Sequence, residues 1–139
     1  MKKIIASPHA PKAVGPYSQA VEAGGALYVS GQLPIDGATG KMAEGVEAQT
    51  HRSLTNLRHI LEEGGYTLGD VVKTTVLLQD IGDFAAMNAV YARKRRRGFP
   101  PADKCVSRMR GASFTPFVNN LWIKLVCVAG FFHIKESFL

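Results

Sequence analysis

The sequence has few of the residues that cross-link a chain or anchor it in a membrane. Its 139 residues include two cysteines, Cys105 and Cys127, which are too few for a disulfide framework in a chain of this size. Nothing else points to secretion, so both are expected to be reduced thiols. No apolar run approaches the roughly 20 residues that a membrane-spanning helix needs. We therefore expect a non-membrane protein stabilised by a hydrophobic core, for which this length is sufficient.

The N-terminal segment carries no recognisable targeting signal. Lys2 and Lys3 precede no long apolar stretch, and Pro8 and Pro11 interrupt the residues that follow. The segment therefore matches neither a secretory signal peptide nor an Arg-rich transit peptide. Together with reduced thiols, this predicts a cytoplasmic location.

Histidine is also scarce, and it is poorly placed for binding metal. The four histidines are scattered, and no His/Cys cluster has the spacing of metal ligands. His51 and His59 lie eight residues apart on a predicted helix, where they share a face only loosely. We expect no metal site.

Positive charge exceeds negative charge, but the excess is local. The formal net charge is +6, yet the segment Arg93–Arg110 contains eight of the 17 basic residues and a single acidic one, Asp103. The run Arg93–Arg97 fits the last turn of a helix, where cations complement the helix dipole, or a patch for nucleic acid or another polyanion. No aromatic residues alternate with these cations, so a base-stacking platform is not indicated. The sequence thus gives nucleic acid little support as a partner.

The N-terminal part of the chain predicts a β-hairpin. Lys3–Ile5 fits a short edge strand, residues 7–15 a loop rich in proline, and residues 17–22 a second strand. Gly24-Gly25 is a hairpin turn signal. Residues 26–33 have the β-branched and aromatic content of a return strand.

From Val46 the period changes to that of a helix. Gly64-Gly65 would end this helix, and its inner face would be formed by Leu54, Leu57, Ile60 and Leu61.

Residues 70–79 are the clearest strand, and Asp83 can cap a second helix. The inner face of that helix would be formed by Phe84, Met87, Val90 and Tyr91. Residues 121–129 predict a final apolar strand. The order predicts a single α+β domain over residues 1–139, in which two helices cover one face of a mixed sheet.

One stretch, from Arg93 to Asn120, shows no period. It combines the basic run with Pro100-Pro101 and Pro116. A solvated loop is one interpretation, and a segment altered relative to the ancestry of the domain is the other. The tail, 131–139, is atypical as well.

Two short polar turns form the candidate functional site. Gly15-Pro16-Tyr17-Ser18-Gln19 places a phenol and small polar groups beside a rigid turn, and Ser30-Gly31-Gln32 lies across the predicted hairpin. We therefore expect the two segments to be neighbours in space. Gly31, inside the predicted strand, would leave backbone N–H groups open to a ligand. Taken singly, Tyr17 also fits a half-buried aromatic residue, and Ser30 a satisfied core hydroxyl.

These turns belong to a series of motifs in fixed order. The series consists of Gly15–Ala20, Leu27–Gln32, Val71–Val76 and Asp80–Phe84, followed by Asn88 and Tyr91. In sequence and spacing it resembles the Rid family, the reactive intermediate deaminases, which is also called the YjgF or L-PSP endoribonuclease family. The resemblance is closest to the archetypal RidA branch, and it runs from about Ile4 to Tyr91.

The resemblance implies a chorismate-mutase-like α+β fold of the bacillus type. It also implies a homotrimer whose sheets form a central barrel, with ligand clefts between subunits. The implied activity is hydrolysis of 2-iminobutanoate and 2-iminopropanoate to 2-oxo acids and ammonia. No cofactor is expected, because the imine carbon is already electrophilic. The protein would hold the carboxylate of a small imino acid, or another small carboxylate, and would position a water.

The resemblance also assigns residues. Tyr17 would line the cleft, while Ser30 and Gly31 would lie near the reacting end of the substrate. These three are the expected catalytic residues. Asn88 at the rim of the cleft and Cys105, which is in register with the family motif, are expected to bind substrate.

Two positions depart from the family pattern. Asp103, at the remaining substrate-binding position, stands where the family has an arginine that grips the substrate carboxylate. An aspartate there would repel a carboxylate. Val126 stands where the family has a water-positioning glutamate, and a hydrocarbon cannot orient or deprotonate water.

Three explanations of these departures stay open. The chain could be a divergent member with another ligand, or Lys104, Arg108 or Arg110 could replace the arginine after a register shift. Alternatively, the reading frame of the gene could change within residues 93–120. Two other functions are compatible with the sequence. One is non-catalytic binding of a small metabolite for regulation, and the other is RNA cleavage with inhibition of translation, which the basic segment would assist by attracting phosphates.

Overall fold

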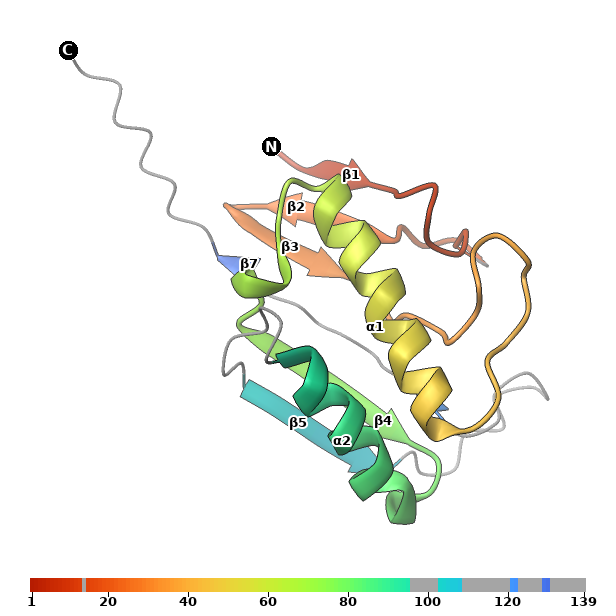
Figure 1. Ribbon diagram of the computed structural model, residues 1–139. Coiled ribbons are helices and arrows are strands. Elements are labelled where there is room, and N and C mark those ends of the chain that lie inside the picture. The colour runs from red at the N-terminus through yellow and green to blue at the C-terminus, as the bar shows by residue number, and fades with distance from the viewer. Residues whose placement is uncertain (14, 96–102, 109–120, 123–128, 131–139) are drawn as a thin grey trace.

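The computed structural model of the chain describes residues 1–13, 15–95, 103–108, 121–122 and 129–130 (Figure 1). Its elements follow one another in the order β1 (Lys3–Ile5), β2 (Ala20–Ala23), β3 (Ala26–Val29), α1 (Val46–Glu63), η1 (Leu68–Asp70), β4 (Lys73–Leu78), η2 (Ile81–Asp83), α2 (Phe84–Arg95), β5 (Asp103–Arg108), β6 (Leu121–Trp122) and β7 (Ala129–Gly130).

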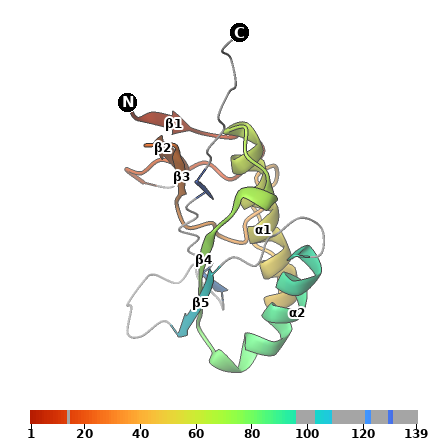
Figure 2. The ribbon, with the colours of Figure 1, turned by 90° about the vertical axis from the view of Figure 1, so that its left-hand side faces the viewer.

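The strands form one layer and the two α-helices form the other (Figure 2). One sheet is antiparallel, with the strand order β1-β2-β3-β7. In the other, of order β5-β4-β6, β4 pairs parallel with β5 and antiparallel with β6. The α+β class and the two helices on one face are thereby confirmed. The described strands form two sheets rather than one, and only the second is mixed.

The β2–β3 hairpin turns at the two predicted glycines. Gly24 and Gly25 have φ angles of 59° and 76°, the left-handed pair that a type I′ hairpin turn requires. The strands are shorter than expected, because residues 17–19 precede β2 and residues 30–33 follow β3. Gly31 therefore lies outside the strand in which the sequence placed it.

The core lies between α1 and both sheets. The predicted stripe is confirmed, since each of its four residues is at most 1% exposed: Leu54, Leu57, Ile60 and Leu61. Their buried cluster includes Leu27 and Val29 of one sheet and Val76 and Leu78 of the other. One apolar helix face thus joins the two sheets into a single core.

The C-terminal end of α1 is closed by glycine, as predicted. Gly65 has a φ of 81°, and the Tyr66 N–H donates to the Leu61 carbonyl at 2.8 Å. The Tyr66 hydroxyl then donates to Glu22 Oε1 of β2 at 3.1 Å. Burial, followed by the bond to this carboxylate, raises the pKa of Tyr66.

The start of α2 differs from the expectation. Asp83 lies inside η2, and the capping carboxylate found here is Asp80, whose Oδ1 accepts from the Gly82 N–H at 2.8 Å. Phe84, expected on the inner face, is 38% exposed and follows directly after the η2 turn. The other three expected residues are buried, and Tyr91 exchanges a 2.8 Å hydrogen bond with Thr74 of β4.

The stretch read as a loop contains a strand. Residues 103–108 form β5, which pairs in parallel with the whole of β4, from Lys73↔Asp103 to Leu78↔Arg108. The expectation of a solvated loop is wrong here, because backbone pairing to a buried strand does not need a clean side-chain period. The described parts of the expected strand 121–129 are β6 and β7, which belong to different sheets. Neither helix of the described chain has an apolar stretch that could cross a bilayer.

The loop between β3 and α1 packs against the N-terminal segment. Asp36 accepts from the Ala38 and Thr39 N–H groups at 2.9 and 3.0 Å and pairs with Arg52 of α1 at 2.8 Å. These backbone donors, and then Arg52, lower the pKa of Asp36. At Gly37 the loop approaches the N-terminal segment so closely that an added Cβ would lie 3.0 Å from the His9 carbonyl oxygen.

We therefore expect Gly37→Ala to lower the free energy of unfolding by about 1–3 kcal/mol, because the atoms that Cβ would meet belong to the backbone and cannot rotate away. Urea denaturation measures this. The matched control is Ala38→Ser, at the exposed neighbouring position, which should stay within about 0.5 kcal/mol of the parent. Equal stability of both variants would show that the loop does not rest on residues 9–11.

Candidate functional site

The two polar turns meet at a small pocket open to solvent. Its wall comes from residues 11–19 on one side and residues 31–35 on the other, and it is lined by Pro11, Lys12, Tyr17, Gln19, Gly31, Gln32, Leu33 and Ile35. Tyr17 and Gly31, two of the three expected catalytic residues, therefore line one site.

Ser30, the third, holds the two turns together. Its N–H donates to the Gln19 carbonyl at 2.9 Å, and its hydroxyl donates to the Ser18 carbonyl at 2.6 Å. These bonds continue the β2–β3 pairing beyond the end of both strands. The Ser30 proton is committed to the backbone, while its oxygen can still accept a hydrogen bond. Ser30 thus lies next to the pocket residue Gly31, and its bonds to the Ser18 and Gln19 carbonyls hold the two turns together.

Gln19 is the buried centre of this region, at 6% exposure. Its Oε1 accepts from the Ser7 N–H at 2.7 Å, while its Nε2 donates to the Ser7 and Pro11 carbonyls at 3.3 and 2.8 Å. One amide therefore fastens the N-terminal segment to the hairpin. On the other wall, Gln32 is 5% exposed and donates to the Ser30 carbonyl at 3.0 Å.

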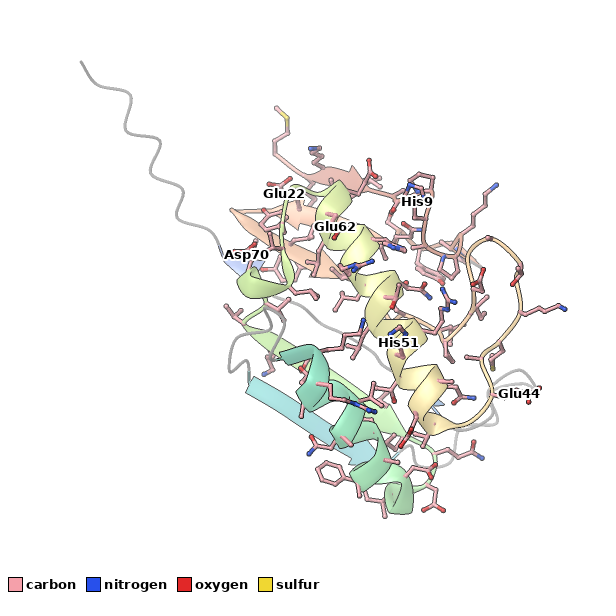
Figure 3. All side chains as sticks on the ribbon, in the orientation of Figure 1. His9, Glu22, Glu44, His51, Glu62 and Asp70 are labelled. Atoms are coloured by element: carbon pink, nitrogen blue, oxygen red, sulfur yellow. The ribbon has the colours of Figure 1, made fainter. Side chains whose placement is uncertain are left out.

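A second contact fixes the same N-terminal segment to α1. The Nδ1 of His59 lies 2.9 Å from the His9 carbonyl oxygen, which accepts, so this nitrogen carries the proton. The two imidazole rings meet edge to face with their centroids 5.7 Å apart (His9 is labelled in Figure 3). Pro11 and Lys12 are therefore held near the pocket by contacts on both sides of His9.

The charge around the pocket is small and positive. Lys12 is the one charged residue among the described residues that line it. The labelled carboxylates Glu22 and Asp70 lie toward the opposite end of the β2–β3 hairpin from His9 (Figure 3). The described lining therefore combines one positive charge with uncharged polar and apolar groups.

The other expected site residues lie elsewhere in the chain. Asn88 is a half-buried residue of α2, and Asp103 and Cys105 belong to β5, opposite Lys73 and Thr75. Asn88 is not among the described residues that line the pocket.

The basic residues considered as replacements for the family arginine, and the remaining positions noted in the sequence, are not part of the pocket as described. Lys104 and Arg108 belong to strand β5, whereas Arg110, Val126 and Cys127 lie outside the described residues. The described part of the chain contains no group of three or more metal-ligating side chains.

His51 lies on α1, on the outer side of the helices, and several cations lie close to it (Figure 3). Partial burial, and then the nearby cations led by Lys94 and Arg52, lower its pKa. Cations of α1 and α2 therefore surround His51.

Sequence reasoning missed Lys12, Leu33 and Ile35 as lining residues, and it assigned no role to Gln19. Lys12 lies in a segment without period, and its proximity to Tyr17 depends on the Gln19 and His59 contacts. The available signal for Gln19 was its place in a polar motif directly before the buried Ala20.

A family model described as Endoribonuclease L-PSP matches residues 7–110. The chain belongs to the endoribonuclease L-PSP family. This confirms the resemblance to the Rid or YjgF family. It also carries the family match beyond Tyr91, where the recognised motifs end, and through β5.

Individual relatives agree. A RutC family protein of Pyrococcus horikoshii is 52% identical over 93 residues, which are 66% of this chain and 74% of the relative. The 2-iminobutanoate/2-iminopropanoate deaminase of Salmonella typhimurium is 45% identical over 112 residues, 79% of this chain and 88% of that protein. The crystal structure of Escherichia coli TdcF with bound serine is 32% identical, covers 91% of this chain and 98% of that chain, and superposes with a TM-score of 0.82.

We expect Gln19→Leu to lower the free energy of unfolding by about 2 kcal/mol or more, because it leaves the buried Ser7 N–H without its acceptor and two carbonyls without their donor. Thermal or urea denaturation measures the loss. The neighbouring Ser18→Ala variant is the control, since Ser18 enters the site contacts through its backbone carbonyl. A Gln19→Leu protein as stable as the Ser18→Ala protein would contradict the role given to this amide.

Proposed function

We propose that this protein hydrolyses small 2-imino acids, 2-iminobutanoate and 2-iminopropanoate, to the corresponding 2-oxo acids and ammonia. The observation that carries the proposal is the pocket shared by Tyr17 and Gly31. Both belong to the family motifs, and a relative that is 45% identical is named for this reaction. A bound serine in a related structure supports a small amino-acid-like ligand for the family site.

The proposed reaction needs little from the protein beyond placement. Water adds to the imine carbon and forms a tetrahedral amino alcohol, which then expels ammonia and leaves the 2-oxo acid. The C=N carbon is electrophilic without a cofactor, so the task of the site is to hold the carboxylate and orient both reactants. The Gly31 N–H and the Tyr17 hydroxyl are suitable donors at the pocket, and Lys12 supplies positive charge.

A second candidate is non-catalytic binding of a small carboxylate for regulation. It is favoured by Asp103, which stands at the register position of the carboxylate-gripping arginine of the family. A negative charge there would weaken substrate binding. RNA cleavage, suggested by the family description, is supported by the cations around His51 and by the basic segment Arg93–Arg110, which would attract phosphates.

The functional unit is proposed to be a cytoplasmic homotrimer with the clefts between its subunits. The sheet face away from the helices supports this assembly. Ile4 pairs with Val21, and Val21 with Tyr28, so these three side chains form a row across β1, β2 and β3. Ile4 is 68% and Tyr28 46% exposed in the isolated chain, and an apolar row of this kind suits burial against another copy.

Adding the purified protein to a dehydratase that generates 2-iminobutanoate is expected to accelerate ammonia release above the rate in free solution. The variant Asp103→Arg should raise kcat/KM by about tenfold, because a guanidinium attracts and clamps the carboxylate that an aspartate repels. Glu44→Arg, which changes the net charge equally in an exposed loop, should have no effect. No acceleration by either the parent or the Asp103→Arg protein would exclude deamination, and ligand-dependent thermal stabilisation without turnover would then favour the regulator.

The variant Tyr28→Glu is expected to convert the trimer to monomers, because it places a charge in the apolar row. Light scattering coupled to size-exclusion chromatography measures the mass. Tyr28→Phe keeps the ring and should remain trimeric. A parent protein that is monomeric at every concentration, or a trimeric Tyr28→Glu protein, would contradict assembly through this face.

A further inference from the structure

The inner face of α1 carries a buried polar stripe beside its apolar one. Gln49, Ser53 and Asn56 follow one another at intervals of four and three residues, and their exposures are 3%, 0% and 0%. This spacing places them on one side of the helix. Burying amide side chains costs free energy unless they form hydrogen bonds, so the partners that the two amides have found indicate what the stripe is for.

The amide of Asn56 bonds two backbone carbonyls of the pocket wall. Its Nδ2 donates to the Leu33 carbonyl at 3.0 Å and to the Ile35 carbonyl at 2.8 Å. Both residues line the pocket. The two protons of one planar amide thus fix two alternate carbonyls of the same short segment, which restricts both its position and its twist.

Only the donor side of Asn56 is used. Its Oδ1 is buried and has no hydrogen-bond partner among the described residues, even though an unpaired buried acceptor is costly. Gln49 shows the same asymmetry on the same loop: Nε2 donates to the Ala43 carbonyl at 3.0 Å, and Oε1 has no partner within the described part of the chain. Ala43 does not line the pocket. The two amides therefore anchor the same loop in the same way, but Asn56 binds two carbonyls of the pocket wall and Gln49 binds one carbonyl outside it.

The other end of the wall is fixed independently of the helix. Ser30 is bonded to residues 18 and 19, and Gln32 donates to the Ser30 carbonyl. Asn56 acts one and three residues beyond Gln32. Gly31, and with it the distance between Gly31 and Tyr17 across the pocket, is thereby held between two anchor points.

We propose that Asn56 is a positioning residue of the ligand pocket, which acts by fixing the Leu33 and Ile35 carbonyls and so the wall that carries Gly31. The identity of the ligand in this inference rests on the proposed function, but the placement of the wall does not. The Asn56 side chain contacts the backbone carbonyls of the wall from the side of the helix. It is therefore distinct from the residues expected to contact substrate.

The test compares two matched variants, Asn56→Leu and Gln49→Met. Each replaces a buried amide by an apolar side chain of similar size on the same helix face, and each releases the same loop. Two properties are measured: hydrogen exchange of the Gly31, Gln32, Leu33 and Ile35 amides, and the Kd for 2-oxobutanoate, a stable product of the proposed reaction. Urea denaturation of both variants records their global stability.

Asn56→Leu is expected to accelerate exchange of these amides and to raise the Kd by about tenfold or more. Gln49→Met should leave both properties near those of the parent at comparable global stability. Equal effects of the two variants, or unchanged exchange in Asn56→Leu, would overturn the proposal. If Asn56→Leu does not fold, the pair Asn56→Ala and Gln49→Ala, which also removes the amide donors, replaces the first pair with the same criteria.

The outcome also separates the two proposals. A parent protein that does not bind 2-oxobutanoate would count against the proposed function, and the exchange of the wall amides would still decide the role of Asn56. Normal 2-oxobutanoate binding by the parent together with an unaltered Asn56→Leu protein would overturn only the positioning role.

Discussion

The register of the β2–β3 hairpin is the constraint on which the rest of the structure depends. Two consecutive glycines in the left-handed region fix a two-residue turn, and the turn sets the pairing from Ala23↔Ala26 to Ala20↔Val29. Because successive side chains of a strand alternate between faces, a slip of one residue would exchange the buried and exposed sets. The same register directs Leu27 and Val29 to the core and Tyr28 to the outer face, and it brings Ser30 opposite Gln19.

Beyond the ends of the strands, buried side-chain amides, rather than backbone N–H groups, donate the hydrogen bonds that hold the backbone carbonyls of the loops. Gln19 joins the N-terminal segment to the hairpin, Gln32 folds back onto the Ser30 carbonyl, and Asn56 binds the following segment from the helix. Each amide donates to carbonyls in loops that no sheet satisfies. A pocket of irregular backbone can therefore sit on a small core, since buried polar groups are tolerated when they are paired.

The family relationship and the charges at the site bear on different questions. Membership is secured by residues 7–110 and by relatives of known name, and it makes imine hydrolysis the leading proposal. The local chemistry is less uniform: Lys12 lines the described part of the pocket, and Asp103 stands where the resemblance implies a carboxylate-binding arginine.

The sequence by itself determined the features that depend on local patterns. The apolar stripe at Leu54, Leu57, Ile60 and Leu61 predicted α1, Gly24-Gly25 predicted the hairpin, and the motifs around Tyr17 and Ser30 identified the family. These succeed because a helical period or a glycine turn is encoded within a few residues. The α+β class followed from their order.

Only the tertiary structure decided what depends on distant partners. The strand at residues 103–108 forms by pairing with β4 and leaves no clean period in the sequence. Phe84 is partly exposed rather than buried, and Asp80, not Asp83, is the carboxylate that caps the η2 turn. Lys12 lines the pocket because Gln19 and His59 fasten its segment. Asn56 anchors the pocket wall from a position 23 residues away from Leu33, and such a contact becomes visible only after the core has brought the helix and the loop together.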